Sequence, residues 1–298
     1  MQLKELEIKT ISQDSPKFPS LLKEIPNPPS QIYVLGELPE EESPKIAIVG
    51  TRKATNQGRL IANELAKKLS EQGFVVVSGL AMGIDSAAHE GAVAVNSRTI
   101  AVLACGLDTI YPRQNENLAK KILELGGAII SEYPIGVSAL PHQFLERNRI
   151  VSGLSVATIV VEAPRESGAL VTARLAAEQG REVFVIPGPI NHPNYYGSHQ
   201  LIRDGARLVA SIDDILEDLG INISVNQRTH QRQSASMVEK ITDENQLLVL
   251  KIIREFGQPL NIDKIIELTK LEPQVVNQIL AILIINGLIK ETERGYTI

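Results

Sequence analysis

Short apolar runs alternate with longer amphipathic stretches between residues 46 and 220, and this alternation is the strongest pattern in the chain. The runs are rich in β-branched residues on both faces, as expected for strands that helices cover on both sides. Repeated strand–helix units predict an open parallel sheet with helices on both faces, an extended Rossmann-like α/β domain. The predicted strands are 45–49, 75–78, 99–103, 128–131, 157–161 and 182–186, with a short seventh near 207–210. The predicted helices are 58–72, 84–95, 115–125, 168–179 and 211–219.

The segments on either side of this domain have other patterns. Residues 1–45 form a proline-rich lead-in that excludes long helices, because proline lacks an amide donor, although residues 31–36 could add one short strand. Residues 221–240 contain few apolar side chains and predict a solvated linker. Residues 241–298 predict helices at 244–256, 261–269 and 273–286 and then a small hairpin, the outline of a winged-helix domain.

Composition removes several classes of protein. The chain has 298 residues, a formal net charge of −5 and a single cysteine, Cys105. One cysteine excludes a disulfide framework and a cysteine-based zinc cluster, and it fits a reducing cytoplasm. The five histidines lack metal-ligand spacing, no secretory signal is visible, and no apolar run approaches the ~20 residues that span a bilayer. We therefore expect a cytoplasmic protein that carries no metal or other cofactor.

The positions of the arginines are more informative than the negative total. Between residues 46 and 220, 11 of the 16 basic side chains are arginine, which suits bidentate contact with phosphate. Ligands of open parallel sheets bind beyond the carboxyl ends of the strands, so the loops there are the candidate site. Three of these loops present glycine or hydroxyl residues where a helix begins, and unpaired amides at helix starts attract anions. This edge of the sheet therefore predicts contact with a track of phosphates.

Other ligand classes that use this fold are disfavoured. A dinucleotide-binding turn needs Gly-x-Gly-x-x-Gly after the first strand, and here the first loop has only Gly50 and then Gly58. Neither a Gly-Lys-Ser/Thr phosphate loop nor a Gly-x-Ser-x-Gly nucleophile elbow occurs. His89 has no catalytic partner at a revealing spacing, so packing or hydrogen bonding is its expected role. Phe144, three residues before Arg147, is either a core residue or a platform for base stacking.

A series of motifs follows the order of these loops. They are Val49-Gly50-Thr51-Arg52, Ser78-Gly79-Leu80-Ala81-Met82-Gly83-Ile84-Asp85, Gly106-Leu107-Asp108-Thr109-Ile110-Tyr111-Pro112, Ser131-Glu132-Tyr133-Pro134, Arg147-Asn148-Arg149-Ile150, Val161-Glu162-Ala163, Ser167-Gly168-Ala169-Leu170-Val171-Thr172-Ala173 and Pro187-Gly188. In this order they resemble the DNA-processing protein A family, also called Smf, of bacterial natural transformation. The resemblance covers the lead-in, residues 46–220 and the tail.

The resemblance implies a homodimeric protein that binds single-stranded DNA, displaces single-strand-binding protein and helps to place the RecA recombinase on incoming strands. The residues expected to bind DNA or its phosphates are Gly50, Thr51, Arg52, Lys53, Ser78, Gly79, Gly83, Ile84, Asp85, Phe144, Arg147, Asn148, Arg149, Ser167 and Gly168. Full charges for the phosphates would come from Arg52, Lys53, Arg147 and Arg149. We therefore expect a non-enzymatic mediator of recombination whose strand binding tolerates any base sequence, because phosphate contacts carry no base information.

Two alternatives from other classes remain at this point. One is a nucleotide-processing enzyme, such as a phosphoribohydrolase, that uses the same pocket with Glu162 or Asp85 as acid or base. The other is a scaffold for protein interactions. The tail adds a separate expectation: no Lys or Arg occurs between Glu272 and Ile289, where a DNA-reading helix would carry them. The tail domain is therefore expected to bind DNA weakly, and instead to contact protein or support the dimer.

Overall fold

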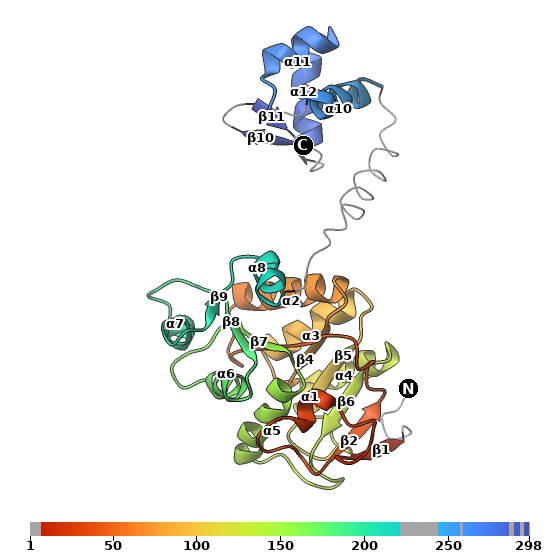
Figure 1. Cartoon of the computed structure of the whole chain (residues 1–298), viewed down its shortest axis with the longest axis vertical. Helices are drawn as coiled ribbons and strands as arrows, with labels where there is room; N and C mark the ends of the chain where they lie inside the picture. Colours follow the sequence, from red (N-terminus) through yellow and green to blue (C-terminus); the bar gives the residue numbers. More distant parts are fainter. Residues whose placement is uncertain (1–6, 221–243, 257–258, 286–288, 293–294, 298) are drawn as a thin grey trace. The chain divides into compact units, whose positions relative to one another are not determined.

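The computed structural model describes residues 7–220, 244–256, 259–285, 289–292 and 295–297. The chain divides into two compact units, Met1–Gly220 and Ile221–Ile298. The larger unit is built on a nine-stranded sheet with the order β1-β2-β6-β5-β4-β3-β7-β8-β9 (Figure 1). Its strands are β1 (Ile8–Ser12), β2 (Gln31–Gly36), β3 (Lys45–Val49), β4 (Val75–Ser78), β5 (Thr99–Leu103), β6 (Ala128–Ser131), β7 (Ala157–Val160), β8 (Glu182–Val185) and β9 (Arg207–Leu208).

Neighbouring strands from β6 to β9 are parallel, whereas β2 pairs antiparallel with both β6 and β1. The predicted α/β class is thus confirmed as a mixed, mostly parallel sheet. Each of the seven strands predicted between residues 45 and 210 is present, and the last three end one or two residues early. Their apolar side chains alternate between the faces, as strand geometry requires: Ala47 and Val49 join one core cluster, and Ile46 and Ile48 join another.

Helices cover both faces of the sheet (Figure 1). On one side lie α2 (Asn56–Glu71), α3 (Ile84–Ala94), α4 (Glu116–Glu124) and α8 (Ile212–Asp218). On the other side lie α1 (Ser20–Lys23), α5 (Pro141–Gly153) and α6 (Gly168–Glu178). The remaining helix, α7 (Tyr196–Arg203), contacts α6 and β8.

Four elements of this unit were not predicted from the sequence: β1, α1, α5 and α7. Strand β1 pairs with β2 along its whole length, so the proline-rich lead-in adds two strands to the sheet rather than one. Helix α5 begins at Pro141, which is tolerated in a first turn because the amide there has no intrahelical partner. Its buried residues include Ile150 and Val151 but also three polar side chains, Gln143, Arg147 and Ser152, which weaken the apolar pattern.

Strand β3 is the point at which the order of the sheet reverses. The chain runs from β3 through β4 and β5 to β6 on one side, then returns to β7 on the other side of β3. Loops that leave β3, β4 and β7 therefore diverge at the same edge and leave a crevice between them, the usual ligand position in open α/β sheets. The fold thus brings the predicted loops together at the carboxyl ends of the strands.

The smaller unit contains α10 (Glu244–Phe256), α11 (Ile262–Thr269), α12 (Pro273–Ile285), β10 (Lys290–Thr292) and β11 (Gly295–Thr297). Val249, Ile265, Val276 and Leu283 lie at the centre of its own apolar core. The predicted linker 221–240 lies outside the described residues. Among the helices that the structure describes, none is both long and apolar enough to cross a membrane.

Candidate functional site

An open cleft of about 630 Å³ lies at the carboxyl ends of β3, β4 and β7. It is lined by the loop after β3, the loop after β4, one face of α5, and the loop that leads from β7 into α6. Of the residues predicted to bind phosphate, those that line it are Gly50, Thr51, Arg52, Lys53, Gly79, Asp85, Phe144, Arg147, Asn148, Ser167 and Gly168. Ser78, Gly83, Ile84 and Arg149 are not among the lining residues. The structure therefore brings most of the predicted set into one cleft.

Arg52 and Lys53 extend from the loop after β3 as exposed side chains. Neither has an ion-pair partner among the described residues. Two backbone hydrogen bonds fix the loop that carries them. The Thr51 amide donates to the Glu162 carbonyl over 2.8 Å, and the Thr51 carbonyl accepts from the Ile84 amide. Gly83 has a φ of +90°, and a Cβ atom there would overlap the carbonyl oxygens of Thr51 and Arg52, so only glycine fits this close approach.

The rings of Phe144 and Tyr111 form an aromatic cluster beside Arg52. The Arg52 guanidinium carbon lies 4.7 Å from the centre of the Phe144 ring, and the Tyr111 ring centre lies 5.6 Å from that of Phe144. Phe144 is half-buried and lines the cleft, whereas Tyr111 is exposed. Phe144 therefore does not lie in the core, and a cation and two aromatic rings lie together at one place, an arrangement that can hold a base next to a phosphate.

Arg147 has a different environment from Arg52. Only 4% of Arg147 is exposed, and its Nη1 donates to the carbonyls of Gly79, over 2.8 Å, and of Val102. It lies beside the buried carboxyl group of Asp85, whose Oδ2 accepts from the Gly79 amide over 3.1 Å. Burial raises the pKa of Asp85, and the Arg147 charge and the amides of Ala81 and Gly79 oppose that rise. Arg147 thus ties the end of β5 and the loop after β4 together at the floor of the cleft.

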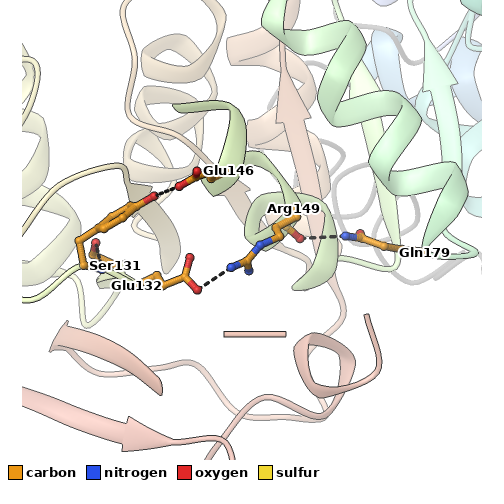
Figure 2. A network of polar contacts seen from close by, with 6 residues as sticks. Ser131, Glu132, Glu146, Arg149 and Gln179 are labelled. Atoms are coloured by element: carbon orange, nitrogen blue, oxygen red, sulfur yellow. Dashed lines mark hydrogen bonds and ion pairs between the residues drawn. The ribbon is translucent and has the colours of Figure 1, made fainter. Parts of the chain in front are cut away.

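Arg149, which was predicted to hold phosphate together with Arg147, is not among the residues that line the cleft. Its Nη2 is 2.5 Å from Glu132 Oε1, and its carbonyl accepts from Gln179 over 3.0 Å (Figure 2). Successive residues of an α-helix are rotated by about 100° around its axis, so residues two apart differ by about 200°. Arg147 and Arg149 therefore project from opposite sides of α5. Arg149 joins α5 to the loop after β6 and to α6.

The remaining predicted residues mainly position the loops. Ser78 is buried and donates to the Ile48 carbonyl over 2.7 Å, and Ile84 is buried beneath Gly50. Asn148 Nδ2 donates to the Gly168 carbonyl over 3.3 Å and so joins α5 to the start of α6. Ser167 caps α6, since its hydroxyl accepts from the Ala169 amide. These contacts preorganise the rim of the cleft.

Glu162 supports the loop that carries Arg52, a role that its position in the sequence does not indicate. It is completely buried, and its carboxylate accepts from the Thr55 amide over 3.0 Å, the Thr55 hydroxyl over 2.6 Å, Asn194 Nδ2 over 3.0 Å and the Tyr195 hydroxyl over 3.2 Å. Asn194 Nδ2 also donates to the Lys53 carbonyl over 3.1 Å. Burial alone would raise the pKa of Glu162, but these hydrogen bonds outweigh it and lower the pKa.

This environment disfavours Glu162 as an acid or base. Both oxygens accept hydrogen bonds from the protein, and Glu162 is not among the residues that line the cleft. His89 is also buried, bonds through Nδ1 to the Thr99 hydroxyl over 2.8 Å, and has a pKa that burial lowers to about 3. In the part of the chain that the structure describes, no group of three His, Cys, Asp or Glu side chains could hold a metal ion.

Comparisons with known proteins agree with the motifs. A family model described as DNA recombination-mediator protein A matches residues 9–220. The chain is 46% identical over 209 residues to Protein Smf of Escherichia coli, with 70% of this chain and 56% of that protein covered. It is 41% identical over 217 residues to DNA processing protein DprA of Bacillus subtilis, with 72% and 73% covered. The chain spans a little over half the length of the Smf proteins of E. coli and Synechocystis.

Two solved structures are similar in fold. One is the X-ray structure of DNA processing protein A from Streptococcus pneumoniae, with a TM-score of 0.67, 40% identity, and 72% of this chain and 75% of that one covered. The other is DNA processing protein A from Helicobacter pylori, whose structure is described as giving insight into its single-stranded DNA binding mode. It has a TM-score of 0.64 and 31% identity, and covers 74% of this chain and 98% of its own.

Proposed function

Because the chain belongs to the DNA recombination-mediator protein A family, we propose that its α/β unit binds single-stranded DNA along the cleft at the carboxyl ends of β3, β4 and β7. One observation carries the proposal: Arg52 is exposed, lacks a carboxylate partner among the described residues, and its guanidinium carbon lies 4.7 Å from the centre of the half-buried Phe144 ring. A cation beside an aromatic ring can hold a phosphate and stack the base next to it.

Each residue of the cleft then has a role. Arg52 and Lys53 contact phosphates, and Phe144, with Tyr111 beside it, stacks a base. The start of α6 at Ser167 and Gly168 faces the same cleft and adds the partial positive charge of a helix N-terminus. Arg147, through Gly79, fixes the floor beneath the strand. Contacts of these kinds read the backbone and the ring faces, so binding is tolerant of base sequence.

A titration of labelled single-stranded and duplex oligonucleotides at two salt concentrations tests the proposal. We expect the single strand to bind more tightly, because a duplex cannot present an unstacked base to Phe144. We expect affinity to fall as salt rises, because each phosphate contact releases condensed counterions. Equal binding of both forms, or binding that salt does not change, would argue against this cleft as the site.

A separate assay for base release from nucleoside monophosphates distinguishes strand binding from nucleotide chemistry. Base release from nucleoside monophosphates at a measurable rate would support the enzymatic alternative, in which Asp85 remains the candidate acid or base because it lines the cleft. We expect strand binding without turnover, since the Asp85 carboxylate already accepts from the Gly79 amide and lies beside Arg147.

The family description, DNA recombination-mediator protein A, supports a wider role in recombination. We propose that the protein works as a homodimer in the cytoplasm, protects incoming single strands during natural transformation, and hands them to the RecA recombinase. The test measures the strand-dependent ATPase of RecA on DNA coated with single-strand-binding protein. Addition of this protein should shorten the lag before ATP hydrolysis, and an unchanged lag would confine the proposal to strand binding.

A further inference from the structure

A second arginine–aromatic pair lies next to the cleft, beside the lining residues Pro164 and Glu166. Arg165 follows β7, and its guanidinium carbon lies 5.1 Å from the centre of the Tyr196 ring, at the first residue of α7. Both side chains are exposed, with 36% of Tyr196 accessible. Like Arg52 and Phe144, this pair places a cation against an aromatic ring, here in the loop between β7 and α6 and at the start of α7.

The pair is held in position by hydrogen bonds behind it. The Gly197 amide donates to the Ala163 carbonyl over 2.9 Å, and the Ala163 amide donates to the Ser198 hydroxyl over 3.1 Å. A Cβ atom on Gly197 would overlap the carbonyl oxygens of Ala163 and Pro164, so the start of α7 packs directly on this backbone. The backbone next to Tyr196 is therefore attached to the segment that immediately precedes Arg165.

The pair also adjoins the cleft. Pro164 and Glu166, on either side of Arg165 in the chain, line the cleft, as do Ser167 and Gly168. A strand that fills the cleft and leaves it over the loop between β7 and α6 reaches Arg165 and Tyr196 next. Arg165 has no ion-pair partner among the described residues, in contrast to Arg98, Arg149, Arg181 and Arg207, each of which contacts a carboxylate.

We propose that Arg165 and Tyr196 form a second nucleotide subsite, which binds a phosphate and stacks a base of the same single strand after it leaves the cleft. This inference rests on the proposed function of the cleft. It assigns the strand a path from Phe144 across the start of α6 to α7. Bases stack on aromatic rings and on guanidinium planes alike, so the stacked pair accepts a base without being separated.

The test uses the full chain and two fluorescent oligothymidylates, one of about 4 nucleotides, which fills the cleft, and one of about 16, which extends past it. Wild type should bind the longer strand more tightly. Tyr196→Ala and Arg165→Gln should each weaken binding of the longer strand about tenfold, the size of one lost base–aromatic contact, and leave the shorter strand unchanged. Tyr196→Phe should retain the wild-type affinity, because the ring rather than the hydroxyl group makes the contact.

Controls keep the outcomes distinct. Arg98, which directly precedes β5, is paired with Glu40. Arg98→Gln removes the same charge as Arg165→Gln, and it should change the affinity for either strand by no more than about twofold. The longer strand should carry 2-aminopurine at successive positions, since stacking quenches its fluorescence. One quenched position should recover in Tyr196→Ala while another recovers only in Phe144→Ala.

Three results would overturn the subsite: equal wild-type affinity for both strands, equal losses on both strands in the two variants, or a change in oligomeric state measured by sedimentation in place of a change in strand affinity. The last result would assign the pair to a contact between copies of the chain. Absence of binding to the short strand by the wild-type protein would instead refute the proposed function of the cleft.

Discussion

The loop after β3 and helix α5 both supply basic side chains near the cleft, but their environments are opposite. Arg52 is exposed, lies against the Phe144 ring, and lacks a carboxylate partner among the described residues. Arg147 is buried and donates to backbone carbonyls, and Arg149 pairs with Glu132. The arginines that cluster in the sequence therefore include some that are available to a ligand and others that hold the binding site together.

Replacement of Arg147 should have the largest effect on stability. We expect Arg147→Ala to lower the free energy of unfolding by ~3–5 kcal/mol, because the buried Asp85 carboxyl group loses its neighbouring charge and two carbonyls lose their donor. Urea unfolding measures the change. A variant that unfolds like wild type but no longer binds DNA would place Arg147 among the strand's direct ligands and remove its contrast with Arg52.

Arg52 should affect binding without affecting stability. We expect Arg52→Ala to weaken binding to homopolymeric single strands by ~1.5–3 kcal/mol, on the order of ten- to a hundredfold, because a charge-assisted phosphate contact is lost. The midpoint of unfolding should not change, since the side chain is exposed. Fluorescence anisotropy and urea unfolding on the same preparation give both values, and Lys53→Ala offers a neighbouring comparison. Wild-type affinity in both variants would contradict the account.

Glu162 should affect both properties to a smaller extent. We expect Glu162→Gln to destabilise the protein by ~1–3 kcal/mol, because an amide replaces one of two accepting oxygens in a buried cluster. Binding should weaken several-fold, since the Lys53 carbonyl shares a donor, Asn194, with Glu162. Asn194→Ala provides a second route to the same loop and should weaken binding in the same direction.

The effect of Glu162→Gln on stability should depend on pH in a definite direction. The pKa of Glu162 is lowered on folding, so its contribution to stability is present above the unfolded value near 4.5 and is lost as pH falls through the folded value. The difference in unfolding free energy between wild type and Glu162→Gln should therefore be constant near pH 7 and shrink below about pH 4.5. A difference that grows on acidification would refute the assignment of an ionised, hydrogen-bonded carboxylate.

Arg149 should give the smallest effect. We expect Arg149→Gln to cost ~1 kcal/mol of stability or less, as for a partly exposed ion pair, and to leave strand affinity within about twofold of wild type. Glu132→Gln is the matched control and should reproduce the loss in stability. A large loss of DNA affinity in Arg149→Gln alone would restore α5 as a phosphate clamp.

The sheet was accessible from the sequence because its strands are apolar on both faces and the amphipathic stretches lie between them. Helix α5 was missed because buried Gln143 and Arg147 interrupt its apolar face, and α7 because its buried residues, Gly197 and Ser198, are not apolar. Strand β1 was missed because only two of its five residues are apolar, Ile8 and Ile11.

The loops of the site followed from the rule for open parallel sheets, but the state of each side chain did not. Glu132 lies 17 residues before Arg149, and Thr55 lies 107 residues before Glu162. Nothing in the local sequence indicates which carboxylate a given arginine meets, because the packing of α5 and of the loop after β6 determines the pairing. The different roles of Arg52 and Arg149 could therefore be recognised only from the folded structure.

The salt dependence of strand binding in matched variants tests this separation most directly. The logarithm of affinity falls linearly with the logarithm of salt concentration, with a slope of ~0.7 for each phosphate contact on a single strand. We expect the slope to decrease by ~0.7 in Arg52→Ala and to remain at the wild-type value in Arg149→Gln. An unchanged slope in Arg52→Ala together with a reduced slope in Arg149→Gln would show that Arg149, and not Arg52, contacts the phosphates.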